Sequence, residues 1–143
     1  NKINTGKLID IRARKFLKKD NLDFEHGTGH GVGFFLNVHE GPQAISKYNK
    51  VKICEGMILS NEPGYYKKGH FGIRIENLLY VKKENKKLFF ENLTLAPIDK
   101  DLIDFKQLTK FEKNYLFKYN LLVYSKLSPY LNKNEKKWLV SFI

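Results

Sequence analysis

Four glycines alternate strictly with other residues in one segment of the chain, His26-Gly27-Thr28-Gly29-His30-Gly31-Val32-Gly33. Each glycine costs about 1 kcal/mol in a helix interior, so the four together disfavour a helix here. We therefore expect an extended or looped backbone, although the i, i+4 spacing of His26 and His30 would suit one face of a helix. Glycine at alternate positions also removes the side chains from one face and lets another part of the chain approach closely.

Around this segment the sequence predicts an α+β chain, in which a helix and strands are followed by further helices rather than by repeated βαβ units. Residues 5–19 predict an amphipathic helix, because apolar side chains recur there at near-helical spacing. These side chains are Leu8, Ile11 and Phe16. Glu84-Asn85 predicts a turn between strands. The expected strands are 57–61, 71–81, 88–90 and 93–95.

From residue 101 onward the pattern becomes helical. Thr109 and Glu112 have the spacing of a capping box, in which each side chain bonds the other residue's backbone amide. We expect a helix over 109–127 and a last helix that Asn134 caps.

The charge of the chain does not by itself indicate a nucleic-acid partner. Its 26 basic residues and 15 acidic residues give a net charge of +11. Only three of the basic residues are arginine, whose planar fork is favoured by proteins that recognise phosphates and bases. We interpret the charge as a solvated surface and expect no specific nucleic-acid binding.

Cysteine content and hydropathy favour a cytoplasmic location. Cys54 is the only cysteine among 143 residues, so no intramolecular disulfide can form, which suits a reducing compartment. We expect Cys54 to be a small buried side chain. No apolar run approaches the ~18–20 residues that span a bilayer, so we expect no membrane partner.

Three of the four histidines lie close together in the sequence, at His26, His30 and His39. Each taken singly is best interpreted as a hydrogen-bonded structural residue. His39-Glu40 begins like the zinc-protease motif H-E-x-x-H, but Gly41-Pro42 would break the helix that this motif requires, and Gln43 replaces its second histidine.

Two glutamates can complete a metal site with one of these histidines. Glu62 precedes a proline, which biases its backbone toward an extended conformation. Glu76 lies within the expected strand 71–81, on the same face as Arg74, which could pair with it. One histidine and two glutamates are a normal ligand set for Mn²⁺, Fe²⁺, Co²⁺ or Zn²⁺.

Two segments carry a specific resemblance to a known family, HGTGHGVGFFLNVHEGP at 26–42 and NEPGYYKKGHFGIRIEN at 61–77. They resemble the Xaa-Pro aminopeptidases (aminopeptidase P), which are pita-bread metallopeptidases related to prolidase, creatinase and methionine aminopeptidase. The helical tail resembles the C-terminal extension of the cytosolic, three-domain subgroup. The resemblance implies the C-terminal half of a pita-bread catalytic domain, a curved and mainly antiparallel sheet with helices, over residues 1–98. A short helical extension would follow over 99–143.

The resemblance also implies a set of metal ligands. In the family, two Asp, one His and two Glu hold two metal ions, and the His and both Glu match His30, Glu62 and Glu76, with Glu76 bridging the metals. The two Asp and a further catalytic His lie upstream in the family, and nothing before His26 matches their motif. The sequence also lacks an initiating Met. We therefore expect the chain to be the C-terminal part of a longer enzyme and to be inactive alone.

The other site residues follow from the same resemblance. His39 matches the family's histidine that contacts the substrate and the tetrahedral intermediate. His26 matches a histidine that lines the pocket for the penultimate proline. Arg74 is expected to support a ligand carboxylate from outside the ligand set.

The implied function is that of a metalloprotease, an aminopeptidase that removes the N-terminal residue from peptides with proline in second position. Two divalent ions, Mn²⁺ in the first place and Zn²⁺ or Co²⁺ otherwise, would hold the attacking hydroxide. A homodimer is implied because the tail takes part in dimerisation in the subgroup. Two alternatives stay open: a metal-free pita-bread module that binds peptides or histones, and a sister enzyme, prolidase or methionine aminopeptidase.

Overall fold

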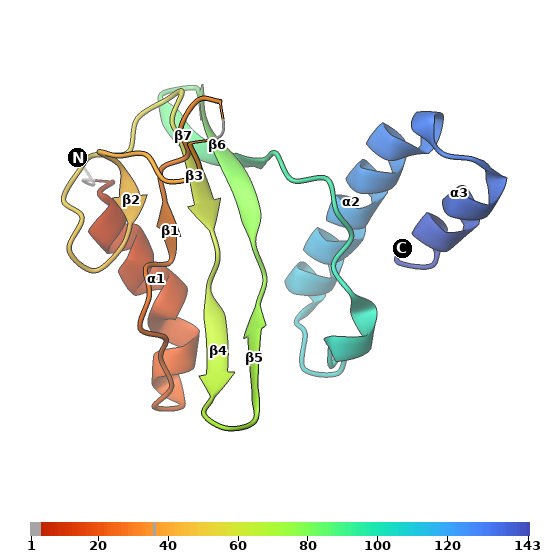
Figure 1. Ribbon diagram of the computed structural model, residues 1–143, viewed down its shortest axis with the longest axis horizontal. Helices are drawn as coiled ribbons and strands as arrows, with labels where there is room; N and C mark the ends of the chain where they lie inside the picture. The colour runs from red at the N-terminus through yellow and green to blue at the C-terminus, as the bar shows by residue number, and fades with distance from the viewer. Residues whose placement is uncertain (1–3, 36) are drawn as a thin grey trace. The chain divides into compact units, whose positions relative to one another are not determined.

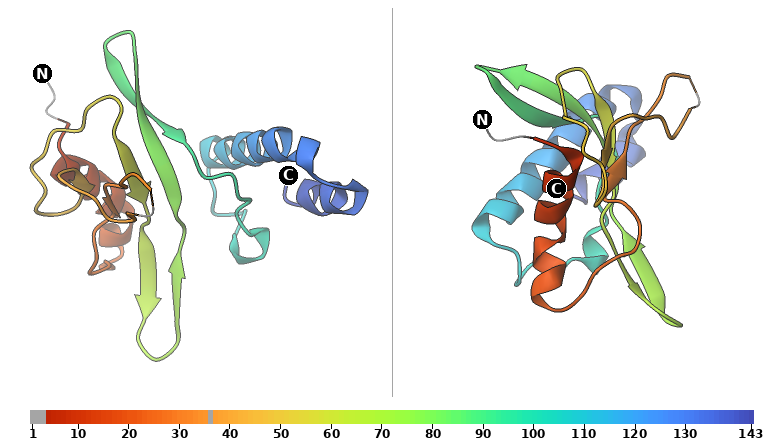
Figure 2. Two further views of the ribbon diagram at one scale, coloured as in Figure 1. Left: turned by 45° about the horizontal axis from the view of Figure 1, so that its top comes forward. Right: turned by 90° about the vertical axis from the view of Figure 1, so that its left-hand side faces the viewer.

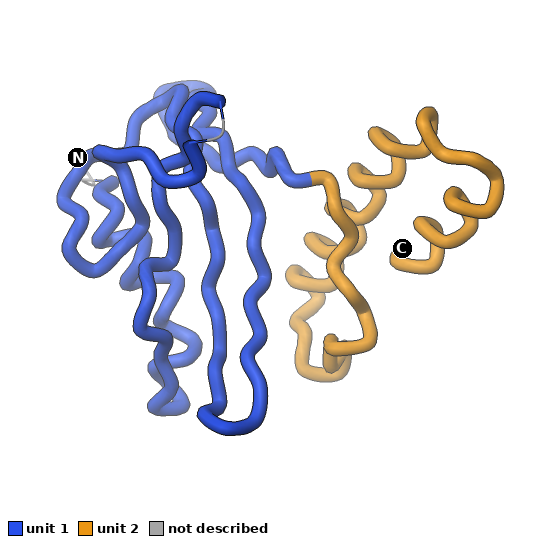
Figure 3. The backbone as a smooth tube through the Cα atoms, in the orientation of Figure 1, with its two compact units in different colours: residues 1–94 blue, residues 95–143 orange. Residues whose placement is uncertain are grey.

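The computed structural model describes residues 4–35 and 37–143 and divides the chain into two compact units (Figure 3). Unit 1 comprises residues 1–94 and unit 2 residues 95–143. Among the described residues, unit 1 contains one helix and all the strands, whereas unit 2 is helical (Figure 1). This order of helix, strands and helices confirms the predicted α+β class.

The paired strands of unit 1 are antiparallel. β1 (Gly29–His30) pairs with β2 (Ala44–Ile45), and β4 (Gly64–Lys67) pairs with β5 (Phe71–Arg74). A third sheet has the order β3 (Ile58–Asn61), β6 (Asn77–Glu84), β7 (Lys87–Asn92). The β6–β7 turn consists of Asn85 and Lys86, whose φ angles of 47° and 64° are those of a two-residue type I′ turn. The predicted turn is therefore confirmed to within one residue.

Helix α1 (Gly6–Lys19) confirms the helix predicted at 5–19, with Thr5 at its N-cap position. The predicted apolar face, however, does not pack inward: Leu8, Ile11 and Phe16 are 42%, 54% and 68% exposed. The buried positions are instead Gly6, Asp10 and Arg14. The charged pair can be buried because each partner supplies the other's counter-charge and hydrogen bonds.

The hydrophobic core of unit 1 brings together Ile45, Ile53, Leu59 and Val81. Cys54, expected to be buried, is exposed. Successive side chains of an extended segment point to opposite sides, and its neighbour Ile53 occupies the inward position.

The two predictions for the later strands need correction. No strand exists at 93–95: β7 ends at Asn92, and beyond it the amide of Leu78 donates to the side-chain hydroxyl of Thr94 rather than to a backbone carbonyl. The strand predicted over 71–81 is divided, since β5 ends at Arg74 and β6 begins at Asn77. Glu76 therefore lies between two strands rather than within one.

The chain segment that pairs with β5 and β6 is also interrupted, between β3 and β4. The flanking pairs are Asn61 with Asn77 and Gly64 with Arg74. Figures 1 and 2 show the two chain segments running side by side through the interruption as one long ribbon that ends in the β4–β5 turn.

Unit 2 consists of two 3₁₀ turns, η1 (Lys100–Leu102) and η2 (Ser128–Tyr130), and two helices, α2 (Lys110–Leu127) and α3 (Lys133–Val140). Tyr119, Val123 and Leu139 form its buried core. Within the described part of the chain, no helix combines the length and apolar character needed to cross a membrane.

Both helices of unit 2 begin with a capping box. The predicted box of α2 is confirmed, and the hydrogen bonds that Glu112 accepts from Thr109 lower the pKa of its carboxyl group. The cap of α3 is Asn132 rather than the predicted Asn134. Its side chain accepts hydrogen bonds from the amides of Asn134 and Glu135, which a cap two residues later could not do.

Candidate metal centre

Glu62 and Glu76 occupy the interruption in the ribbon, Glu62 between β3 and β4 and Glu76 between β5 and β6. The Glu62 N–H donates to the carbonyl oxygen of Thr28, 2.7 Å away. In the register that the two ladders share, Pro63 stands opposite Ile75. Pro63, which follows, has no N–H to donate. The register of the ladders on either side thus brings the two glutamates to the same place.

His30 reaches this place from the segment of alternating glycines, which runs against β3. A Cβ at Gly29 would collide with the carbonyl oxygen of Ser60, so the close approach expected from sequence is found here. The Nδ1 atom of His30 lies 2.9 Å from the carbonyl oxygen of Gly31. Because a carbonyl oxygen only accepts, the neutral ring carries its proton on Nδ1, and Nε2 is left with a lone pair. Nε2 is 3.2 Å from Oε1 of Glu62.

His30, Glu62 and Glu76 together form the candidate metal centre. One ligand atom from each lies within 4.8 Å of those from the other two. In residues 4–35 and 37–143 no second cluster of this kind is formed by histidine, cysteine, aspartate or glutamate side chains. Imidazole nitrogen and carboxylate oxygen are donors that divalent transition-metal ions accept, so the set fits such an ion.

The carboxylate of Glu62 is nearly buried, and both of its oxygens accept hydrogen bonds. The hydroxyl of Ser60 donates to Oε1 at 2.9 Å, and Nη1 of Arg74 donates to Oε2 at 3.0 Å. The structure therefore brings Arg74 to a candidate ligand carboxylate. The hydrogen bond to Tyr66, with the nearby carboxylates of Glu62 and Glu76, raises the pKa of the Arg74 guanidinium.

His26 joins this network through a residue that sequence reasoning did not single out. Nε2 of His26 lies 2.7 Å from the hydroxyl of Tyr66, which in turn accepts a hydrogen bond from Nε of Arg74 at 2.9 Å. Nδ1 of His26 is 2.7 Å from the carbonyl oxygen of Gly27. The proton of the neutral ring is therefore on Nδ1, and Tyr66 donates to Nε2.

His39 lies beside the metal centre on the loop that follows β1. Its ring centroid is 4.1 Å from that of His30, with the ring planes inclined by 37°. The loop is held by a backbone hydrogen bond of 2.9 Å from the amide of Glu40 to the carbonyl of Gly31. The imidazole of His39 is thus close enough to contact a molecule bound at the centre.

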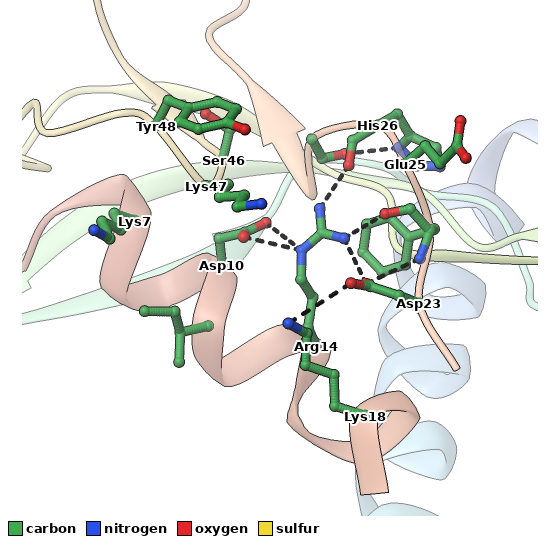
Figure 4. A pocket seen from close by; sticks show the side chains of 13 residues that line it. Lys7, Asp10, Arg14, Lys18, Asp23, Glu25, His26, Ser46, Lys47 and Tyr48 are labelled. Carbon is green, nitrogen blue, oxygen red and sulfur yellow. Dashed lines mark hydrogen bonds and ion pairs between the residues drawn. The ribbon is translucent and has the colours of Figure 1, made fainter. Parts of the chain in front are cut away.

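Arg14 on α1 holds the segment that leads to the site histidines (Figure 4). Nε donates to both carboxylate oxygens of Asp10, at 3.0 and 2.9 Å. The terminal nitrogens donate to the carbonyl oxygens of Phe24 and His26, at 2.5 and 2.6 Å. The backbone of this segment is thereby attached to α1.

Two further groups complete this attachment. The hydroxyl of Thr28, fully buried, donates to Asp10 at 2.6 Å. Asp23 accepts from Arg14 at 2.7 Å. Burial by itself would raise the pKa of the Asp23 carboxyl, but the hydrogen bonds from Arg14 and from the amide of Phe24 lower it.

Comparison with family models covers most of the chain. Residues 3–83 match metallopeptidase family M24, and residues 86–141 match the C-terminal region of peptidase M24. The chain belongs to metallopeptidase family M24. The first match includes the candidate metal centre, and the second includes both helices of unit 2.

Curated relatives in this family are similar over nearly all of the chain. A probable Xaa-Pro aminopeptidase P of Coprinopsis cinerea is 47% identical over 148 residues, which cover 94% of this chain and 24% of that protein. An uncharacterized peptidase of Schizosaccharomyces pombe is 47% identical over 146 residues, again 94% of this chain and 24% of that protein. The chain spans about a quarter of the length of these relatives.

Solved structures in the same family share the fold. A crystal structure of X-prolyl aminopeptidase from Caenorhabditis elegans, described as a cytosolic enzyme with a di-nuclear active site, matches with a TM-score of 0.89 and 38% identity. The match covers 96% of this chain and 24% of that one. Prolidase from Pyrococcus furiosus has a TM-score of 0.55 and 34% identity, over 64% of this chain and 26% of its own. The predicted family and the predicted pita-bread fold are confirmed.

Proposed function

We propose that the protein carrying this chain is a metal-dependent aminopeptidase that removes the N-terminal residue from peptides with proline in second position. The proposal rests on one observation in a member of family M24: one potential ligand atom each from His30, Glu62 and Glu76 lies within 4.8 Å of the other two. The substrate class is supported by the names of relatives, since the C. cinerea and C. elegans proteins are an Xaa-Pro and an X-prolyl aminopeptidase.

His30, Glu62 and Glu76 would hold two divalent ions, with Glu76 shared between them and two aspartates from outside this chain completing the set. Such ions supply Lewis-acid polarisation of a peptide carbonyl and a bound water of lowered pKa. Mn²⁺ is the first candidate, and Zn²⁺ or Co²⁺ suits the same donors. With three of five ligands, this chain alone should bind metal weakly and cleave no Xaa-Pro peptide.

The other residues of the site would bind and orient the peptide. His39 would donate a hydrogen bond to the carbonyl oxygen as negative charge develops on it. His26 would line the pocket for the penultimate proline, with its ring orientation fixed by the hydroxyl of Tyr66. Glu62 would carry a proton to the leaving proline nitrogen, and Arg74 would keep its carboxylate oriented.

The wider organisation of the protein is part of the same proposal. Residues 1–98 would belong to the catalytic domain and residues 99–143 to a helical extension. The protein would be a cytoplasmic homodimer without a specific nucleic-acid partner. Its likeness to a structure described as a cytosolic enzyme supports the location. A monomeric mass by light scattering at micromolar concentration would contradict the dimer.

Hydrolysis of Arg-Pro-Pro by the complete protein with added Mn²⁺ tests the proposal. Loss of a residue that only supports a metal ligand lowers activity by ~10–100-fold. We therefore expect at least this decrease in kcat/KM for each ligand variant, namely His30→Ala, Glu62→Gln and Glu76→Gln. His70→Ala is the matched control, because His70 is exposed at the β4–β5 turn. Retained activity in a ligand variant would contradict the ligand assignment.

A panel of substrates separates this function from its alternatives. Cleavage restricted to Xaa-Pro dipeptides would indicate a prolidase, and cleavage of peptides that begin with Met would indicate a methionine aminopeptidase. A complete protein that binds peptides but neither binds Mn²⁺ nor cleaves any substrate would be a binding module.

A further inference from the structure

The side chain of Ser60 links two of the candidate metal ligands. It lies in β3, and its residue is 0% exposed. Its Oγ atom is 2.9 Å from Oε1 of Glu62 and 2.9 Å from the backbone nitrogen of His30. The hydroxyl therefore connects a glutamate of its own segment with a histidine thirty residues earlier in the chain.

The chemistry of the three groups determines the direction of both hydrogen bonds. An ionised carboxylate only accepts, so the single proton of the Ser60 hydroxyl is donated to Glu62. The amide of His30 only donates, so a lone pair of the same hydroxyl accepts from it. The hydroxyl cannot rotate without losing a bond in a place from which water is excluded, and such a loss is costly.

The second oxygen of Glu62 shows why this bond matters for the carboxylate. Nη1 of Arg74 donates to Oε2 at 3.0 Å, and a bond to a guanidinium is stronger than one to a hydroxyl. Without Ser60, the carboxylate would be free to turn toward the guanidinium, which can bind both of its oxygens. Oε1 would then leave its position 3.2 Å from Nε2 of His30.

We infer that Ser60 is a positioning residue of the metal centre, which holds Oε1 of Glu62 toward Nε2 of His30 and so keeps the two donors arranged for one ion. The inference rests on the proposed function, because it concerns the residues that would hold the metal. Preorganisation of this kind lowers the free energy needed to bring the ligand atoms into position when the metal binds. The serine acts through Glu62 and the backbone of His30 and contributes no ligand of its own.

Calorimetric titration of the complete, metal-stripped protein with MnCl₂ tests this role. Ser60→Ala should weaken Mn²⁺ binding by ~10–100-fold, the range found when a residue that supports a ligand is removed. Ser60→Thr keeps the hydroxyl and should recover most of the affinity. Ser46→Ala is the matched control, a half-buried serine of the same unit, and should bind Mn²⁺ as the wild type does.

Electron paramagnetic resonance of bound Mn²⁺ provides a readout that a merely structural serine would not change. At saturating metal, the spectrum of Ser60→Ala should differ from that of the wild type, because the position of one carboxylate oxygen has changed. The spectrum of Ser46→Ala should not differ. Thermal melting of the metal-free variants records any separate loss of stability.

The outcomes separate the inference from the proposed function. If the wild type binds Mn²⁺ and cleaves Arg-Pro-Pro while Ser60→Ala matches its affinity and spectrum, the inference is overturned and the proposed function stands. If the wild type neither binds Mn²⁺ nor cleaves Arg-Pro-Pro, the proposed function fails and the inference fails with it. Weaker binding with an altered spectrum in Ser60→Ala alone supports both.

Discussion

Replacing Arg14 with methionine tests whether one buried guanidinium holds the segment that carries His26 and His30. Methionine keeps the apolar stem of the side chain and removes the charge and the N–H donors. Asp10, which is 1% exposed, would remain as a buried carboxylate without its counter-charge. The carbonyl oxygens of Phe24 and His26 would lose the donors that they have in the structure.

The size of the effect follows from the burial of the pair. Breaking a buried ion pair by removing one partner costs about 3–5 kcal/mol. Lys18 provides the contrast, because it lies 3.7 Å from Asp23 and both side chains are exposed, a pair worth about 0–1 kcal/mol. With 1.4 kcal/mol per factor of ten, Arg14→Met should favour opening of the segment by roughly 100- to 4,000-fold, and Lys18→Ala by less than about tenfold.

Hydrogen exchange measured by mass spectrometry on peptides that cover residues 23–31 reports this opening directly. The amides of this segment should exchange faster by the stated factor in Arg14→Met, while peptides from unit 2 keep their rates. If Arg14→Met accelerated exchange no more than Lys18→Ala does, the guanidinium would not be what holds the segment, and the argument from burial would be refuted.

Two other substitutions test the close approach at the glycines and the cap of α2. Gly29→Ala should lower the stability of the protein by about 1–3 kcal/mol, as overpacking does, because the added methyl group would collide with the carbonyl oxygen of Ser60. Gly27→Ala, where a methyl group would make ordinary contacts, is the control, and equal urea midpoints would contradict the prediction. Thr109→Ala should weaken the start of α2 by about 1 kcal/mol, measured as faster hydrogen exchange in its first turn. Because folding lowers the pKa of Glu112, its stabilising effect is present above the unfolded pKa and is lost as the pH falls through the folded value. In Glu112→Gln, the stability of the first turn of α2 should no longer fall as the pH is lowered. If hydrogen exchange still showed the same loss of stability at low pH, the Glu112 carboxylate would not be its source.

The candidate ligands could be predicted from sequence because they lie in the two segments that resemble the Xaa-Pro aminopeptidases, 26–42 and 61–77, whereas the shape of the backbone around them could not. Apolar and polar residues alternate over 73–76, and the polar pair Glu76-Asn77 interrupts that pattern, but the segment contains no proline that would end a strand. The division coincides with Pro63 on the partner segment, which stands opposite Ile75 in the shared register and has no N–H to donate to the ladder. The residue pattern of one strand contains no information about which backbone hydrogen-bond donors the neighbouring strand offers.

Arg14 and Tyr66 were beyond prediction for a different reason. A charged residue on a helix is normally solvated, and Arg14 is buried only because the segment 23–28 offers it acceptors from another part of the chain. Tyr65 and Tyr66 are adjacent and of the same type, so only the register of the β4–β5 hairpin decides which hydroxyl reaches His26.

The two ladders on either side of the interruption also determine where this chain can change in length. An insertion in the turn at residues 68–70 would leave every strand pair near the metal centre unchanged, because that turn lies at the far end of the ribbon. One residue added between Asn61 and Gly64, by contrast, would shift one carboxylate against the other and turn the following side chains to the opposite face. The tip of the hairpin is therefore the position at which an affinity tag or a fluorescent label can be inserted while the spacing of Glu62 and Glu76 is preserved.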